Sequence, residues 1–432
     1  MPQQFRTGDQ SLVRHLNRSI LLQRLWVGSP VSRADLAAGT GLNKTTVSNL
    51  VEELISDGFV REVGRNPSLG GRPGVLLELD PDAGWIIGCE IGVGHLSVAL
   101  ANLRAQVTWR RQAAFSKDDS VQVVLDRLAS LMRQAAKEAQ ATGRRLHGAG
   151  VAVPGLVDIS SGSLVFEPNM GWRSVALRTE LAGRLDLPVI VDNDGNAAAL
   201  AERYFGVAQG VDDFAYVVAN IGLGAGLVIG GHIHYGISGY AGEAGHTTID
   251  PDGPLCRCGN RGCWERLASQ RALIERIEQA SWAGPPPVPD EADWSRATSA
   301  VRLERILQAA GEGDPVVREA LRQTGTYLGI GIANLVNLLN PSLVAFGGSL
   351  SLAHEYLLPV AREVVQQRAM AELRQTTRVV VSSFRQDACV IGGVALVVHD
   401  LLSRPRLVPA GTIVPAEAAT ERGRHPELPV VS

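Results

Sequence analysis

The sequence predicts a mixed α/β protein with two lobes and a cleft between them, preceded by a small winged helix-turn-helix module. Residues 11–58 show three helical patterns with a glycine turn, and two strand-like patterns follow them. Residues 85–107 and 215–236 each have the order strand, glycine-rich turn, strand, which indicates an internal duplication. With 432 residues and 45% hydrophobic content, the chain can bury more than one core.

Composition limits the compartment and the partners. The net charge of −3 argues against a surface coated for nucleic acid along its whole length, but it leaves room for a small DNA-binding module. Residues 1–10 are polar, and the apolar run 85–103 is interrupted by Glu90 and His95, so we expect no export signal and no membrane span. Cys89 and Cys389 lie in apolar strings as free thiols, which fits a reducing cytoplasm.

The N-terminal module begins with three predicted helices. The first spans residues 11–28 and has leucine and isoleucine at helical spacing. Ser32 and Asp35 have the spacing of a capping box for a short second helix, which breaks at a pair of glycines. Asn43 caps a third helix, which stops before Gly58. This order is that of a helix-turn-helix.

The third helix is amphipathic, and its polar face predicts DNA binding. Short hydroxyl and amide side chains can approach base edges, and Lys44 can meet a phosphate. The strand patterns that follow are joined by a basic loop containing GGRP, which would form a wing. The alternative is a small helical protein-interaction domain. The candidate DNA-binding residues are Lys44, Thr45, Thr46, Ser48, Asn49, Arg65 and Arg72.

The large region has one dense cluster of metal-ligating side chains. Residues 242–269 contain three of the five cysteines, and His246, Cys256, Cys258 and Cys263 supply four borderline or soft ligands. Such a set is typical of a closed Cys3His zinc site with a structural role. The alternative is a zinc knuckle that has only a structural role and no ligand-binding site beside it.

Elsewhere in the large region, the pattern predicts a helix at 121–141, strands at 147–154 and 187–192, and a helix opening at Asp194 or Gly195. A helix at 388–402 would return to the first lobe, and residues 325–339 would form a core or dimer-interface helix. Glycine turns can cradle phosphate, but hairpins need glycine in any case, so these turns alone are weak indications.

Several strings together resemble the ROK family of sugar kinases and sugar-responsive repressors. They are PNMGW at 168–172, VDNDGNAAALAE at 191–202, IGLGAG at 221–226, GEAGH at 242–246 and CRCGNRGCWE at 256–265. The resemblance extends over about residues 85–402, and the cysteine string is its specific part. A helix-turn-helix in front of such a body resembles the branch of xylose, glucose and N-acetylglucosamine regulators.

The resemblance implies an actin-like, ribonuclease-H-like fold whose lobes close on a sugar. The matching sugar-binding residues are Asn169, Asn193, Asp194, Glu243, His246 and Glu265. Asp194 matches the catalytic base of the kinases, and in a repressor it would only bind the sugar hydroxyl. One ring nitrogen of His246 would bind zinc and the other would face the sugar.

The glycine turns depart from the kinase pattern, so we expect a protein that is not an enzyme. Glu90 replaces an aspartate, Val93 and Gly94 stand where a second glycine and a threonine are expected, and Leu223 replaces another threonine. The turn 346–348 resembles the adenosine segment of the family. The alternatives are an active ATP-dependent sugar kinase that carries a DNA-binding module and a zinc-stabilised interaction scaffold.

The expected organisation has four parts. They are a winged helix-turn-helix at 1–80, a first lobe at 81–192 with the returning helix 388–402, a second lobe with the zinc site at 193–387, and a disordered tail at 403–432. The expected partners are operator DNA and a small sugar, with structural Zn²⁺ as the cofactor. Because an operator with two half-sites needs a twofold protein, we expect a dimer or a dimer of dimers.

Overall fold

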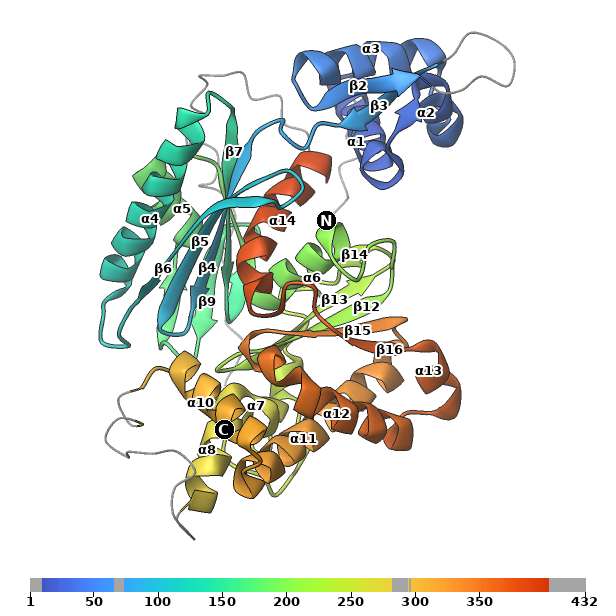
Figure 1. Cartoon of the computed structure of the whole chain (residues 1–432). Coiled ribbons are helices and arrows are strands. Elements are labelled where there is room, and N and C mark those ends of the chain that lie inside the picture. The colour runs from blue at the N-terminus through green and yellow to red at the C-terminus, as the bar shows by residue number, and fades with distance from the viewer. Residues whose placement is uncertain (1–9, 66–73, 282–293, 295–296, 404–432) are drawn as a thin grey trace, which may run out of the picture.

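The computed structural model describes residues 10–65, 74–281, 294 and 297–403. The predicted fold class is confirmed: a small N-terminal module precedes a body with two mixed sheets and helices packed against them (Figure 1). The wing tip with Arg72 and the tail from 404 onward, both subjects of sequence predictions, lie outside the described residues.

The N-terminal module has three helices and a small antiparallel sheet. Its elements are α1 (Gln10–Gly28), β1 (Val31–Ser32), α2 (Arg33–Thr40), α3 (Lys44–Ser56), β2 (Val60–Arg65) and β3 (Val75–Leu79). The capping box of Ser32 and Asp35 is present, and the Asn43 side chain accepts from the Thr46 amide at 2.8 Å. The short β1, which the pattern did not predict, pairs with β3.

The first lobe is built on a five-stranded sheet with the order β11-β7-β4-β5-β6. Its strands are β4 (Trp85–Gly92), β5 (His95–Asn102), β6 (Val107–Ala114), β7 (Leu146–Val153) and β11 (Val189–Asn193). Helices α4 (Val121–Ala141) and α5 (Leu177–Leu185) cover one face through a shared apolar core. A smaller sheet of β8 (Leu156–Asp158), β9 (Ser163–Glu167) and β10 (Trp172–Val175) joins that core.

The second lobe repeats this plan with the strand order β14-β13-β12-β15-β16. Its strands are β12 (Phe214–Ala219), β13 (Leu223–Ile229), β14 (His232–Ile233), β15 (Leu343–Gly347) and β16 (Arg378–Val381). In the first lobe β4 pairs antiparallel with β5 and parallel with β7, and in the second lobe β12 pairs antiparallel with β13 and parallel with β15. The order and direction of strand pairing therefore confirm the predicted duplication.

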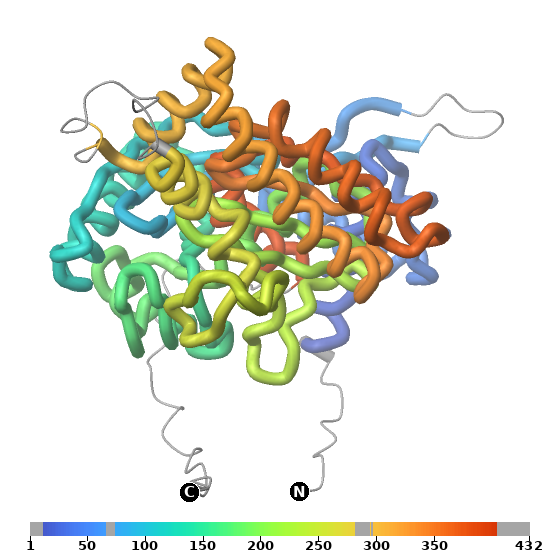
Figure 2. Tube along the Cα trace, turned by 90° about the horizontal axis from the view of Figure 1, so that it is seen from below, coloured from blue at the N-terminus to red at the C-terminus, as the bar shows by residue number. Residues whose placement is uncertain are grey.

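Helices on the outer face of the second sheet form the largest apolar core. They are α7 (Trp264–Ala268), α8 (Gln270–Ser281), α10 (Ser299–Glu312), α11 (Pro315–Leu339), α12 (His354–Arg368) and the short α13 (Ala371–Thr376). The predicted helix 325–339 is the C-terminal part of α11 and packs against α12, where Gly325 and Gly329 leave room for close contact. Seen from below, α4 and α12 lie on opposite sides of the body (Figure 2).

Two helices lie between the sheets. The helix α6 (Asp194–Phe205) begins at one of the two predicted positions, and α14 (Ala388–Ser403) packs against α6, β4 and β7. The helical segment 385–403 is long and apolar enough to cross a membrane by composition, but most of it is buried inside the protein. It is therefore explained as a core helix that joins the two lobes.

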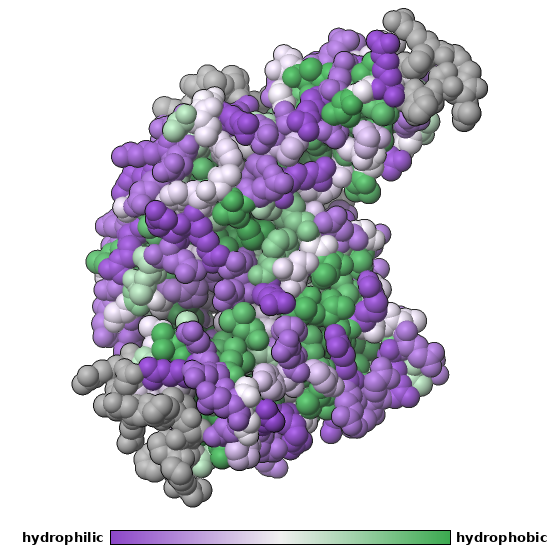
Figure 3. Space-filling view, in the orientation of Figure 1, coloured by the Kyte–Doolittle hydropathy of each residue, from purple (hydrophilic) through white to green (hydrophobic). Residues whose placement is uncertain are grey.

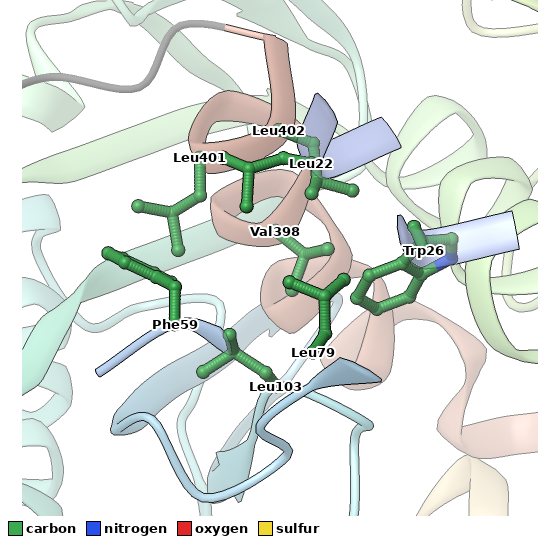
Figure 4. Close-up of a pocket in the computed structure, with 8 residues that line it drawn as sticks. All are labelled: Leu22, Trp26, Phe59, Leu79, Leu103, Val398, Leu401 and Leu402. Atoms are coloured by element: carbon green, nitrogen blue, oxygen red, sulfur yellow. The ribbon is translucent and has the colours of Figure 1, made fainter. Parts of the chain in front are cut away.

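The N-terminal module shares an apolar core with the body. Leu22 and Trp26 of α1, with Phe59 directly before β2 and Leu79 of β3, face the C-terminal end of α14 (Figure 4). The Ser19 hydroxyl also donates to the carbonyl of Leu402. By contrast Leu12, Leu16 and Ile20, which helped to predict α1, are between 42% and 54% exposed. Figure 3 shows a hollow on one side of the molecule between this module and the second lobe.

Candidate functional site

The four predicted metal ligands lie together. The ligand atoms of His246, Cys256, Cys258 and Cys263 are all within 4.8 Å of one another. A tight loop produces this arrangement: the Cys256 amide donates to Asn260 at 2.7 Å, and Gly262 has a φ of +62° where a Cβ would collide with the Asp250 carbonyl. The fold of residues 242–269 thus brings His246 close to the three cysteines.

The distances fit a tetrahedral zinc ion. The sulfurs of Cys258 and Cys263 are 3.7 Å apart, and Cys256 Sγ is 3.7 Å from Nδ1 of His246. With zinc–sulfur bonds of about 2.3 Å, tetrahedral geometry puts two sulfurs about 3.8 Å apart. A Cys3His set with these separations can therefore hold Zn²⁺ as a closed site.

Residues 242–269 also carry three of the predicted sugar ligands, Glu243, His246 and Glu265. While Nδ1 of His246 faces the cysteines, its Nε2 lies 3.8 Å from Glu243. Glu265 follows Cys263 by two residues on α7 and is only 9% exposed, and its carboxylate accepts from the Leu223 amide at 3.1 Å. Coordination at Cys263 and His246 would therefore fix the positions of both carboxylates and of the imidazole.

Asn193 and Asp194 lie where β11 ends and α6 begins. The Asn193 side-chain oxygen caps α6 through the amides of Gly195 and Asn196, and its amide nitrogen donates to the Gly155 carbonyl at 3.1 Å. Both polar ends of Asn193 thus already have backbone partners. Among the described residues, Asp194 accepts a hydrogen bond only from the Gly195 amide, at 2.9 Å, so its carboxylate can accept further hydrogen bonds from a ligand.

Asn169 lies on the turn between β9 and β10. Glu167 and Arg271, which the sequence patterns did not predict as site residues, lie beside it. Glu167, 1% exposed, accepts from the Met170 amide, and Arg271 of α8 donates to Asn169 Oδ1 at 3.0 Å. The only local signal was the position of Glu167 directly before PNMGW. Arg271 is 102 residues from Asn169, so the sequence held no signal that joins them.

Burial and mutual repulsion dominate the electrostatics of the carboxylates around Asp194. Burial, followed by Glu90, Glu243 and Glu167, raises the pKa of Asp194 to about 7. Burial also raises the pKa of Glu167 and of Glu243, and Glu265 adds to both shifts. The predicted residues Asp194, Glu243 and Glu265 are therefore brought into one acidic group together with Glu167 and Glu90.

The first glycine turn is filled by a histidine. His95 Nε2 lies 3.4 Å from a Glu90 oxygen, and the imidazole is so close above Gly92 that a Cβ there would lie 2.0 Å from it. Burial lowers the pKa of His95, but its hydrogen bond and ion pairing with Glu90 outweigh this and raise it overall. An imidazole and a carboxylate therefore occupy the turn that would have to approach a phosphate.

The polar face of α3 is directed to solvent. Lys44, Thr45 and Asn49 are exposed and Thr46 and Ser48 are half-buried, whereas Val47, Leu50, Val51 and Leu54 are buried. Arg65, at the end of β2, is exposed. This arrangement leaves the candidate DNA-binding residues that the structure describes free to meet a groove.

The fold and site define a helix-turn-helix module joined to a two-lobed α/β body that carries a cluster of one histidine and three cysteines. A model of the ROK family matches residues 86–400, and a model of the IclR helix-turn-helix domain matches residues 28–64. The chain belongs to the ROK family, as one of its transcriptional regulators with a helix-turn-helix.

Relatives and solved structures agree with this assignment. The chain is 37% identical over 399 residues to the xylose repressor of Caldicellulosiruptor bescii, covering 92% of this chain and 99% of that one. It resembles the crystal structure of a ROK family transcriptional regulator, a homolog of the E. coli MLC protein, with a TM-score of 0.76, 30% identity and coverage of 90% and 97%. A ROK glucokinase from Streptomyces griseus in complex with glucose and AMPPNP matches with a TM-score of 0.64, 30% identity and coverage of 72% and 99%.

Proposed function

We propose that this protein is a sugar-responsive repressor of carbohydrate-utilisation genes. It binds operator DNA through α3 and the wing, and it binds a sugar between the two lobes beside a structural zinc ion. The observation that supports the proposal is that Asp194, Glu243 and Glu265 lie in one group of interacting carboxylates, in the same chain as an exposed α3 face. Carboxylates, amides and imidazole suit the hydroxyls of a sugar, each of which donates and accepts.

The first sugar to test is xylose, because a repressor aligned over nearly the whole chain is named for it. Asn169, Asn193, Asp194, Glu243, His246 and Glu265 are the proposed contacts. Zn²⁺ held by His246 and the three cysteines would keep His246 and Glu265 in place, and it would supply no chemistry.

In this proposal α6 couples the sugar-binding residues to the DNA-binding module. This helix begins at Asp194 and ends at Tyr204 and Phe205, whose rings lie 5.4 Å and 5.8 Å from the ring of Trp26 on α1. Sugar binding closes the lobes and shifts α6 and α14, and thereby α1 with the attached module. A dimer would then present two α3 helices at a spacing that fits the operator in only one state. Its place of action is the cytoplasm.

Two coupled measurements test the proposal. A thermal-shift screen over xylose, glucose, mannose and N-acetylglucosamine should give a higher midpoint with one sugar, because a ligand of the folded state stabilises it. The same sugar should change operator affinity in a fluorescence anisotropy titration. If no sugar in the panel shifts either quantity, the sugar-responsive function is wrong.

The second candidate is an ATP-dependent sugar kinase. It is favoured by one observation, the pKa of Asp194 near 7, which suits a general base. The Glu90–His95 pair in the first turn opposes it, because the imidazole of His95 lies directly over Gly92, where the backbone would have to approach a phosphate. Sugar-dependent ATP turnover that disappears in Asp194→Asn would establish the kinase.

A further inference from the structure

A direct hydrogen bond joins the two lobes beside the proposed sugar-binding residues. Arg271 lies on α8, whose apolar residues belong to the core of the second lobe. Asn169 lies between β9 and β10, whose Leu164 and Trp172 belong to the core of the first lobe. Nη1 of Arg271 donates to Oδ1 of Asn169 at 3.0 Å, so this contact closes a bridge across the cleft.

The bridge determines which way the Asn169 amide points. A guanidinium has donors only, so its partner on Asn169 must be the oxygen. The amide nitrogen must then point away from Arg271, and it donates to Glu167 and lies near Gly222, beside the Glu265 carboxylate. Asn169 is thereby held with its N–H groups toward the acidic side of the cleft.

The loop that holds the metal ligands reaches the same turn. Arg257, between Cys256 and Cys258, lies with Nη1 3.5 Å from the Asn169 carbonyl, which is a weak contact. Both arginines place positive charge beside the carboxylates of the cleft, and burial followed by Arg257 lowers the pKa of Arg271. The second lobe thus holds the Asn169 turn from two positions.

We propose that Arg271 is a positioning residue that orients the Asn169 amide for the ligand and ties its orientation to closure of the two lobes. This inference rests on the proposed sugar-binding function. Because Arg271 comes from the second lobe, separation of the lobes breaks its bond to Asn169 and leaves the side-chain amide held by Glu167 alone. A ligand that accepts a hydrogen bond from Asn169 Nδ2 is therefore bound better in the closed state.

A double-mutant cycle on the full-length, zinc-loaded protein tests the coupling. The variants are Arg271→Ala, Asn169→Ala and the double variant, and the measurement is the Kd for the sugar that stabilises the unmodified protein. We expect each single variant to weaken binding about tenfold or more, and the double variant to lose little beyond either one. Arg271→Lys should restore part of the affinity. Losses that multiply in the double variant would overturn the inference.

A second readout needs no sugar. Hydrogen exchange of the backbone amides at residues 167–172 should accelerate in Arg271→Ala, because the turn loses its partner in the second lobe. The matched control is Arg276→Ala, which removes a partly buried arginine from the same helix whose bonds go to Thr324 and Leu267. This control should leave the exchange at 167–172 unchanged.

The two readouts separate the two ideas. If the unmodified protein binds no sugar but Arg271→Ala still accelerates exchange at 167–172, the sugar function fails and the bridge between the lobes stands. If sugar binds and Arg271→Ala changes neither Kd nor exchange, the positioning role is wrong and the sugar function stands.

Discussion

Nδ1 of His246 lies 3.7 Å from Cys256 Sγ, while Nε2 of the same ring lies 3.8 Å from a Glu243 oxygen. One imidazole thus connects the metal cluster to the group of carboxylates around Asp194. Under the proposed function the cluster forms part of the wall of the sugar-binding cleft, because the ring cannot turn toward a ligand without changing its distance to the cysteines.

Loss of the metal should therefore damage the cleft before it damages DNA contacts. In Cys258→Ser we expect less bound zinc, sugar affinity lower by about 10- to 100-fold and a lower melting temperature of the body, measured by elemental analysis, calorimetric titration and thermal shift. The control is Cys89→Ala, which removes a buried thiol from the first-lobe core, away from the cluster. Full sugar affinity in Cys258→Ser would contradict a role of the metal in the cleft.

The pKa of Asp194 predicts a pH-dependent stability. Its ordinary value is 3.8, and burial with neighbouring carboxylates raises it to about 7 in the folded protein. Between these two values the folded state binds more protons than the unfolded state, so stability decreases as pH rises through this window. Asp194→Asn removes this loss. From pH 6 to pH 8 the unfolding free energy of the unmodified protein should fall by on the order of 1 kcal/mol more than that of Asp194→Asn.

Chemical denaturation at both pH values measures this difference. Asp118→Asn, an exposed carboxyl change in the first lobe, serves as the control and should show no such dependence. An unchanged pH profile in Asp194→Asn would mean that the carboxyl group ionises freely in the folded protein.

The exposed face of α3 predicts distinct effects on DNA binding. Asn49→Ala should weaken binding to the specific operator by about 1–3 kcal/mol and relax its sequence preference, because an amide can read a base edge. Lys44→Ala should weaken binding to all sequences, because the lysine would contact a phosphate. It should also reduce the slope of log affinity against log salt concentration by about one. Anisotropy titrations at several salt concentrations measure both effects. Arg133→Ala, which removes a charge from the exposed side of α4, should leave both quantities unchanged.

The contact between α6 and the N-terminal module predicts a variant that separates sugar binding from the DNA response. Trp26 packs against Tyr204 and Phe205 and lies under Arg104, whose guanidinium is 4.6 Å from the ring. Trp26→Ala should lower the unfolding free energy by about 3–5 kcal/mol and reduce the sugar-induced change in operator affinity, with sugar affinity itself preserved.

The matched control is Trp109→Ala, which removes the same side-chain type from the edge strand β6. It should destabilise the first lobe but leave the coupling between sugar and operator intact. Equal loss of coupling in both variants would show that α6 has no special part in the response.

Much of this protein could be predicted locally. The capping residues Ser32, Asp35 and Asn43 fixed the helices of the N-terminal module, because such caps act on amides within three residues. The spacing of His246 and the three cysteines predicted the metal site for a similar reason, since a tight loop of fewer than twenty residues brings them together.

Other features depended on contacts between distant segments. Leu12, Leu16 and Ile20 fit the helical pattern yet remain exposed, because periodicity shows which residues share a face but not what covers that face. The short β1 formed only because β3, more than forty residues later, provided a partner.

The sequence by itself determined the principal helices, the duplicated plan and the ligand set of the metal site, because these depend on periodicity, caps and short spacings. Only the tertiary structure decided that Arg271 holds Asn169 and that the pKa of Asp194 rises to about 7. Each of these depends on side chains from different strands or helices that meet at one place. The packing of the two sheets around α6 and α14 brings these distant side chains into contact, and no local sequence pattern predicts that packing.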